Sequence, residues 1–201
     1  NVLGGAVTET GLHDWTGFAN IYDEYKGADS SKWGITQIRK KGLRDFGASL
    51  GPDAAHTVAI GAETLALRQT QQCKNALAMA NFLDQHNAVK AAYYPGLQSH
   101  PQHARAVDLF RYFGGLLSFE LADHIGIWDF MNRFEVIVKS SNLGDNRTLS
   151  IPVSQTIYYE MGAHRRASMG IDESLIRLSV GIEDTEDLIA DLQNAFAGVN
   201  L

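Results

Sequence analysis

The sequence is poor in cysteine and in positive charge. Cys73 is the single cysteine among 201 residues, so no disulfide can form within the chain, which is typical of a reducing compartment. Lys and Arg number 17 against 23 Asp and Glu, a formal charge of −6 that argues against a nucleic-acid partner. No apolar run is long enough to span a bilayer, and no signal-peptide pattern opens the chain. We therefore expect a cytoplasmic protein that binds neither nucleic acid nor membrane.

Motifs for metal ions and phosphate groups are also missing. His100 and His103 lie three residues apart, but a metal site needs a further ligand, and Asp108 is badly phased on the same predicted helix. The glycine pairs at 4–5 and 114–115 lack the third glycine and following helix of a P-loop or dinucleotide site. We expect no metal ion and find no legible Ser-His-Asp arrangement.

Hydrophobic periodicity predicts alternating strands and helices. Strands are expected over 2–8, 89–97, 114–121, 139–153 (interrupted by a Gly-Asp-Asn turn) and 176–182. Helices are expected over 33–46, 53–86 with a bend near Gly61, 101–113, 127–137, and after an N-cap at Asp184 with Leu188, Ile189, Leu192 and Phe196 buried. The long stretch 9–31 is expected to be a loop, and 156–170 a partly helical connection. Strands separated by single helices indicate an α/β or α+β unit.

The predicted strand 176–182 carries an arginine on a face with little else on it. Apolar residues at 176, 178, 180 and 182 alternate with Arg177, Ser179 and Gly181, the pattern of a half-buried strand. We interpret the second face as a guanidinium with open space beside it, suited to an anion. An edge arginine paired with a surface carboxylate is the alternative. Asn142, in the predicted turn 142–145, can add a side-chain amide donor, and the two side chains together would bind a carboxylate.

Seven stretches of the chain match one known family in order. They are VLGGAV (2–7), LRDFGASLGP (43–52), ETLALR (63–68), YYPGLQSHPQH (93–103), GGLLSFEL (114–121), SSNLGDNRTL (140–149) and RLSVGIEDTEDLIADLQ (177–193). On these residues the chain resembles the C-terminal half of the pyridoxal-phosphate-dependent enzymes of cysteine and methionine metabolism. That family includes acylhomoserine sulfhydrylases, cystathionine synthases and lyases, and methionine γ-lyase.

The resemblance implies an α/β fold, the C-terminal part of a fold-type I pyridoxal-phosphate-dependent transferase. Residues 1–52 would end the large cofactor-binding domain, 53–86 would form a linking helix, and 87–201 a small α+β domain with a mostly antiparallel sheet and flanking helices. The chain would contain no catalytic residue, since the Schiff-base lysine is expected just before Asn1. Its partners would be an amino-acid substrate and the N-terminal half of the same enzyme, in a homotetramer built as a dimer of dimers.

The resemblance also implies roles for four residues. Arg177 would clamp the substrate α-carboxylate, and Asn142, where many members have serine, would lie beside the cofactor and help to hold that carboxylate. Arg44 and Asp45 align with a Lys-Asp or Arg-Asp pair that reaches a neighbouring active site in some lyases of the family. The segment 152–157, PVSQTI, lacks the histidine that usually ends this run in the family, which leaves the reaction branch open.

The expected reaction is γ-replacement or γ-elimination on a homoserine-derived or sulfur amino acid with pyridoxal 5'-phosphate as cofactor. Asn142 favours an O-acylhomoserine sulfhydrylase, with methionine or cystathionine γ-lyase and then cystathionine γ-synthase as alternatives. A hypothesis from another functional class is that the chain is a non-catalytic anion-binding module. It is interpreted as a piece of a longer enzyme, present either as a fragment or as one part of a nicked enzyme.

Overall fold

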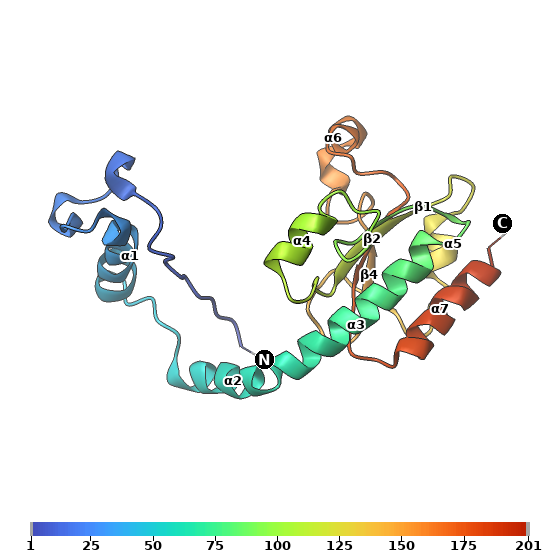
Figure 1. Ribbon diagram of the computed structural model, residues 1–201, viewed down its shortest axis with the longest axis horizontal. Coiled ribbons are helices and arrows are strands. Elements are labelled where there is room, and N and C mark those ends of the chain that lie inside the picture. Colours follow the sequence, from blue (N-terminus) through green and yellow to red (C-terminus); the bar gives the residue numbers. More distant parts are fainter. Residues whose placement is uncertain (1, 200–201) are drawn as a thin grey trace. The chain divides into compact units, whose positions relative to one another are not determined.

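The structure, a computed structural model, describes residues 2–199. It divides the chain into two compact units, Asn1–Glu63 and Thr64–Leu201, which are described separately below (Figure 1). The division lies inside the segment predicted as one long helix. The assignment of the chain to the end of a large domain, a linking helix and a C-terminal domain stays a prediction.

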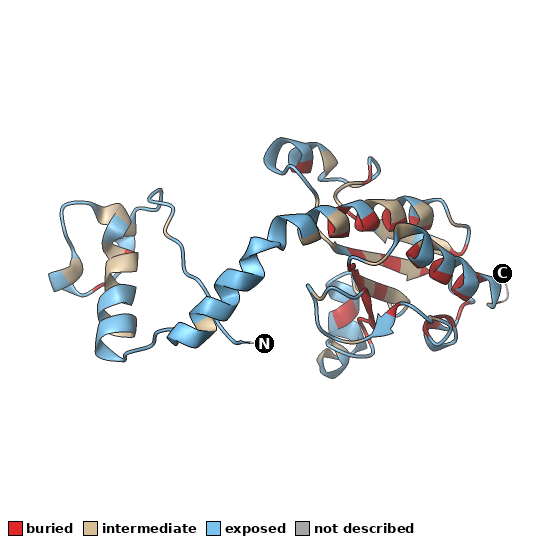
Figure 2. Ribbon diagram, turned by 90° about the horizontal axis from the view of Figure 1, so that it is seen from below, coloured by how far each residue is buried: buried red, intermediate tan, exposed pale blue. Residues whose placement is uncertain are grey.

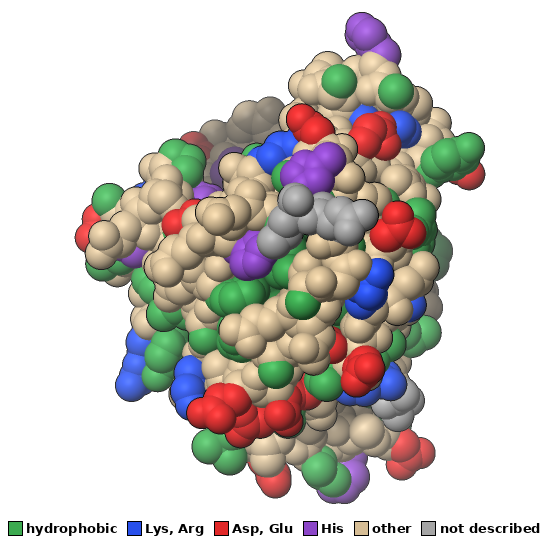
Figure 3. All heavy atoms as spheres, turned by 90° about the vertical axis from the view of Figure 1, so that its right-hand side faces the viewer, with side chains coloured by type: hydrophobic (Ala, Val, Ile, Leu, Met, Phe, Trp, Pro, Cys, Tyr) green, Lys and Arg blue, Asp and Glu red, His purple; other side chains and the backbone are tan. Residues whose placement is uncertain are grey.

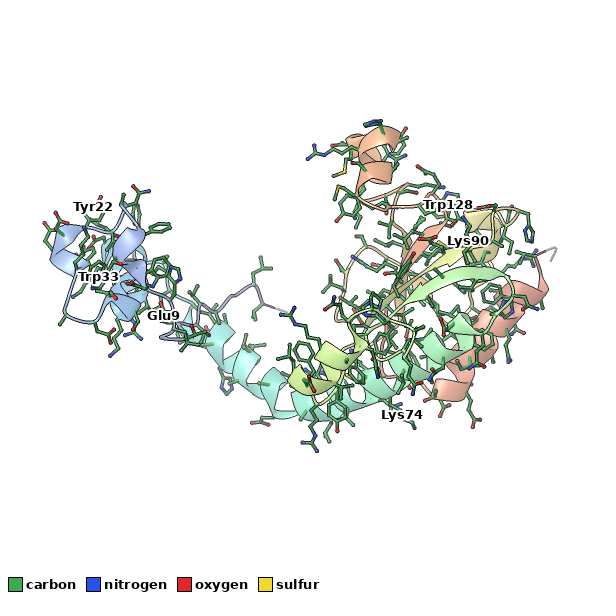
Figure 4. All side chains as sticks on the ribbon, turned by 45° about the horizontal axis from the view of Figure 1, so that its top comes forward. Glu9, Tyr22, Trp33, Lys74, Lys90 and Trp128 are labelled. Carbon is green, nitrogen blue, oxygen red and sulfur yellow. The ribbon has the colours of Figure 1, made fainter. Side chains whose placement is uncertain are left out.

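The first unit consists of short helices joined by irregular chain. They are η1 (Trp15–Gly17), η2 (Asp23–Tyr25), η3 (Ser30–Lys32), α1 (Trp33–Gln37), the π-helix η4 (Ile38–Asp45) and α2 (Pro52–Glu63). The helix predicted over 33–46 is confirmed as α1 followed by η4, and the loop predicted over 9–31 is irregular except for the three short 3-10 helices. Tyr22 and Trp33 lie in this unit (Figure 4), where the Trp33 indole N–H donates to the carbonyl oxygen of Gly27 at 2.7 Å.

The strand predicted over 2–8 is wrong. Residues 2–10 have no regular secondary structure, and the side chain of Leu3 is 95% exposed. A strand requires a neighbour for its backbone hydrogen bonds, and no described segment pairs with this one.

The long helix predicted over 53–86 is in fact two helices, α2 and α3 (Leu65–Asp84). The interruption is at Thr64, whose φ and ψ are −102° and 5°, and not at Gly61 as predicted. No residue of α2 is buried, whereas α3 is buried along one side from Gln72 onward, as the colours of Figure 2 show. α3 thus belongs to the core of the second unit.

A five-stranded sheet forms the centre of the second unit. Its strands are β1 (Val89–Tyr93), β2 (Leu116–Leu121), β3 (Val138–Lys139), β4 (Leu149–Pro152) and β5 (Leu175–Ser179). Their order is β1-β2-β5-β4-β3. All neighbours are antiparallel except β3 and β4, which are parallel. The predicted mostly antiparallel sheet with flanking helices is confirmed, and the fold class is α/β.

Helices α3 and α7 (Thr185–Ala197) pack with the apolar side of this sheet to form the core (Figure 1). Fully buried side chains from these elements include Met79, Leu83, Phe119, Ile176, Leu178, Leu188 and Leu192. The side chain of Asp184 accepts the backbone N–H of Glu186 at 2.8 Å, which confirms the predicted N-cap. The remaining helices are α4 (His103–Leu109), α5 (Ile127–Met131), η5 (Tyr159–Met161) and α6 (Ala163–Ser168).

Helix α5 ends six residues before the predicted end at 137, and the cause is a buried aspartate. The carboxylate of Asp191 on α7 accepts the backbone N–H groups of Glu135, Val136 and Ile137 at 2.8, 3.2 and 2.9 Å. These N–H groups cannot then donate to helical carbonyls four residues earlier. The N–H groups of 135–137 therefore hold a loop against α7.

Two features of the described residues concern membranes and nucleic acids. Within residues 2–199, no helix is both long enough and apolar enough to cross a lipid bilayer. Acidic and basic side chains are interspersed on the face drawn in Figure 3, with one gathering of acidic groups. On that face the described residues form no broad basic patch of the kind that binds nucleic acid.

Candidate functional site

Arg177 lies at the middle of the central strand, on the side of the sheet away from the core. Its neighbours along β5, Ile176 and Leu178, are fully buried, and alternation directs the Arg177 side chain to the opposite side. The register aligns Arg177 with Ser118 on β2 and with Ile151 on β4, and Ser118 is in turn aligned with Tyr93 on β1. The site is thus built on rigid strands.

The Arg177 guanidinium is partly held and partly free. Its Nη2 donates to the carbonyl oxygens of Ser141 and Asn142 at 2.8 and 3.0 Å. Its Nε is buried and has no hydrogen-bond partner among the described residues. Buried donors are nearly always paired in folded proteins, so an orphaned N–H on a cation indicates a missing acceptor. A carboxylate is the acceptor that a guanidinium binds most strongly.

The expected open space along β5 is wrong. Ser179 is 2% exposed, and its Oγ accepts the backbone N–H of Gly144 at 2.8 Å. A Cβ added at Gly181 would collide with the backbone at 146–147. The segment 141–147, called the 141–147 turn below, covers both positions. The expectation failed because a contact across thirty-five residues cannot be recognised in the strand pattern alone.

The structure brings Asn142 to Arg177 through its backbone. The carbonyl oxygen of Asn142 accepts from the guanidinium. The residue is exposed, and its side-chain amide has no hydrogen bond to any described residue. The two predicted substrate-binding residues are therefore neighbours, with the amide of Asn142 unengaged.

Helix α3 contributes two buried polar residues that sequence reasoning missed. The Nε2 of Gln72 donates to the carbonyl oxygen of Asp145 at 2.9 Å. The Nδ2 of Asn75 donates to the carbonyl oxygens of Gly181 and Glu183 at 3.1 and 2.8 Å. The sequence does contain a sign of the role of Asn75. This residue lies one helical turn before the fully buried Met79, on the helix face where an apolar residue is expected.

Arg44 and Asp45 form an ion pair inside the first unit. The Arg44 Nε donates to Asp45 Oδ1 at 2.7 Å, and Lys41 Nζ lies 3.5 Å from the other carboxylate oxygen. The hydrogen bond from Arg44 is the main cause that lowers the pKa of Asp45. Their predicted contact with a neighbouring active site stays a prediction.

The histidines and the cysteine have local structural partners. The Nδ1 of His103 lies 2.9 Å from the carbonyl oxygen of Pro95, and the Nδ1 of His100 accepts the N–H of Gln102 at 3.2 Å. Among residues 2–199, no group of three or more His, Cys, Asp and Glu side chains is placed to hold a metal ion. Cys73 is buried, and burial raises the pKa of its thiol.

An acidic hollow of about 570 Å³ lies between the edge of the sheet and the segment that carries α6. The Tyr93 hydroxyl donates to Glu120 Oε1 at 2.7 Å, and this bond is the main cause that raises the pKa of Tyr93 to about 12. Asp172 at the rim lies 3.5 Å from the Nζ of Lys90, which is labelled in Figure 4. These partners explain the polar groups without a ligand.

Comparison with known proteins identifies the family. Residues 1–197 match the model of the Cys/Met metabolism PLP-dependent enzymes. O-acetyl-L-homoserine sulfhydrylase 1 of Thermus thermophilus is 35% identical over 98% of this chain and 49% of its own length. L-methionine gamma-lyase of Pseudomonas putida is 39% identical over 80% of this chain and 41% of its own length. The structure of cystathionine gamma-lyase from Lactobacillus plantarum, complexed with L-serine, superposes with a TM-score of 0.73 at 32% identity, covering 84% of this chain and 43% of that one.

The chain spans about half the length of the relatives that it matches. Both the sequence match and the structural match extend over most of this chain, and both are to enzymes that act on sulfur-containing or related amino acids. The chain belongs to the pyridoxal-phosphate-dependent enzymes of cysteine and methionine metabolism.

Proposed function

We propose that this chain supplies the substrate-carboxylate site of an O-acylhomoserine sulfhydrylase. The observation that carries the proposal is the buried, unpartnered Nε of Arg177. Leaving such a donor without an acceptor costs about 1–3 kcal/mol, and the α-carboxylate of an amino acid would remove that cost. Since Ser141 and Asn142 occupy Nη2, the unpartnered Nε–H is the donor that would meet the substrate carboxylate.

The cofactor of this family, pyridoxal 5'-phosphate, supplies an electron sink that stabilises negative charge on substrate carbon atoms. In our proposal the chain's own residues bind and orient: Arg177 fixes the carboxylate, and the free amide of Asn142 donates a second hydrogen bond to it. The residues that hold the cofactor, including its lysine, would lie in an N-terminal half. The match to about half of each relative supports this assignment.

The proposed reaction is a γ-replacement. The acyl group leaves the γ-carbon of O-acylhomoserine as a carboxylate, and sulfide forms the new C–S bond, so that homocysteine results. The match over 98% of the chain to the Thermus thermophilus sulfhydrylase supports this branch.

A second candidate is γ-elimination by a methionine or cystathionine γ-lyase. The higher identity to the Pseudomonas putida L-methionine gamma-lyase, 39% over a shorter stretch, favours it. Cystathionine γ-synthase follows as a third, and a non-catalytic anion-binding module is the alternative of another class. We place the enzyme in the cytoplasm as a homotetramer built from dimers, in which Arg44 and Asp45 reach a neighbouring active site.

Substrate choice tests the proposal in the full-length protein. O-acetylhomoserine with sulfide is expected to give homocysteine faster than methionine gives 2-oxobutyrate or than O-acetylhomoserine with cysteine gives cystathionine. Methionine as the preferred substrate would favour the lyase. A protein that binds no cofactor and turns over none of these substrates would favour the non-catalytic module.

Replacement of Arg177 tests the site itself. Arg177→Ala should raise KM for the amino acid by a factor that corresponds to about 2–4 kcal/mol, the worth of a charge-assisted contact. The cofactor's visible absorbance should stay unchanged. Arg165→Ala, on the short helix α6, is the matched control and should leave KM alone. An unchanged KM in Arg177→Ala would remove Arg177 from the site.

A further inference from the structure

The orientation of Arg177 depends on the backbone that its Nη2 contacts. Two successive carbonyl oxygens, of Ser141 and Asn142, accept from this one nitrogen. A guanidinium is planar, so fixing one terminal nitrogen at two points also fixes the direction of Nε. Whatever holds these two carbonyls in place therefore determines where Arg177 presents its free donors.

Ser179 is the side chain that holds this end of the 141–147 turn. It stands two residues after Arg177 on β5, so both side chains project from the same side of the sheet. Its Oγ accepts the N–H of Gly144 at 2.8 Å. Gly144 has a φ of +74°, a conformation that suits glycine and directs its N–H toward the strand.

The other end of the turn has separate anchors. The carbonyl oxygens of Asp145 and Asn146 accept from Gln72 and from the N–H of Ile182 at 2.9 and 2.8 Å. Among residues 2–199, the hydrogen bonds that reach 141–144 come from Ser179 and Arg177 alone. The N–H of Ser140, directly before the turn, donates to the carbonyl oxygen of Ser150 at 3.1 Å. Removal of the Ser179 hydroxyl thus breaks the bond from β5 to Gly144, while Ser140 and the other end of the turn stay attached.

We propose that Ser179 is a positioning residue for Arg177: its hydroxyl holds Gly144, and thereby keeps the carbonyls of Ser141 and Asn142 where they fix the guanidinium for a substrate carboxylate. The inference rests on the proposed function of Arg177. Ser179 does not contact the substrate. It acts through the turn and so affects binding of the carboxylate, not the chemistry at the γ-carbon.

Ser179→Ala in the full-length protein tests the proposal, with Ser150→Ala as the matched control. Ser150 is also buried, at 1% exposed, and its hydroxyl lies 3.4 Å from the carbonyl oxygen of Val138. Its side chain, aligned with Leu178, lies on the core side, and the bond from the Ser140 N–H to its backbone carbonyl oxygen does not depend on the hydroxyl. Ser179→Ala should raise KM roughly three- to tenfold, the effect of one lost hydrogen bond, with kcat within twofold. Ser150→Ala should change neither constant, and thermal melting checks that both variants fold.

A second measurement does not depend on turnover. Acetate, as a carboxylate probe, is titrated into the cofactor-free full-length protein while the Nε–H signal of Arg177 is followed by nuclear magnetic resonance. Ser179→Ala should weaken acetate binding by the same three- to tenfold, and Ser150→Ala should bind like the wild type. Wild-type constants in Ser179→Ala, in both measurements, would overturn the proposal.

The outcomes also separate this inference from the proposed function. If Arg177→Ala raises KM and Ser179→Ala does not, the positioning role alone fails. If Arg177→Ala leaves KM unchanged and acetate leaves the Arg177 signal unmoved, the carboxylate site fails and the positioning role fails with it.

Discussion

Replacement of Asp191 should weaken the second unit more than any surface change on the same helix. Asp191 is 3% exposed and accepts three backbone N–H groups. Hydrogen bonds to a charged group contribute about 1.5–3 kcal/mol each, but they are not additive here. Glu135 and Val136 are exposed, so water can solvate their N–H groups after the substitution, whereas Ile137 is 3% exposed and its N–H would stay buried without an acceptor.

We therefore expect Asp191→Ala to lower the free energy of unfolding by about 3 kcal/mol, well below the sum for three bonds. The higher helix propensity of alanine offsets about 0.5 kcal/mol of the loss. Urea unfolding of the chain, followed by far-ultraviolet circular dichroism, measures the change. Hydrogen exchange should show faster exchange at 135–137.

Asp187→Ala, an exposed aspartate on the same helix, is the control and should cost about 0.5 kcal/mol or less, the usual effect of a charge near a helix N-terminus. If the free energies of unfolding of Asp191→Ala and Asp187→Ala differ by less than about 1 kcal/mol, the three N–H groups find other acceptors. The explanation given for the early end of α5 would then be wrong.

Three further changes test separate parts of the structure. The Cys73 thiol, buried and with a raised pKa, should react with a thiol reagent in urea and hardly at all in the native protein, which counting of labelled thiols checks. Gly181→Ala should destabilise the second unit by about 3 kcal/mol in the same urea assay, because its Cβ would collide with the backbone at 146–147; wild-type stability would contradict that geometry. The bond to Glu120 raises the pKa of Tyr93 to about 12, so its contribution to stability is fully present below the unfolded pKa near 10 and is lost as the pH rises through 12. Glu120→Gln should return the Tyr93 pKa toward 10 in a carbon-13 titration, and an unchanged pKa would count against this bond as the cause.

Local patterns predicted the elements whose stabilising contacts are close in sequence. The last helix begins after Asp184 as predicted, because the N-cap contact spans two residues and the buried stripe repeats at helical spacing. The outward direction of Arg177 on its strand followed from alternation in the same way. Both predictions needed only the residues of the element itself.

Contacts between distant segments decided the rest. The end of α5 depends on an aspartate more than fifty residues later in the chain, and the cover over Ser179 comes from a glycine thirty-five residues earlier. No sequence motif identifies either the aspartate or the glycine as the partner in these contacts. Part of the candidate site was therefore predictable, namely the guanidinium and the adjacent Asn142, while the hydrogen bonds that fix them were not.

The position of β5 has a consequence for the synthesis of the protein. This strand is the last of the five in the chain, yet it lies in the middle of the sheet, between β2 and β4. Until a ribosome has released it, the nascent chain can form only the outer pairs, whose inner backbone groups stay open to other chains. Because pairing across long sequence separations is slow, aggregation competes with folding at this stage. A chain cut before Leu175 would keep those open edges permanently, and quality-control proteases should remove it before it could accumulate.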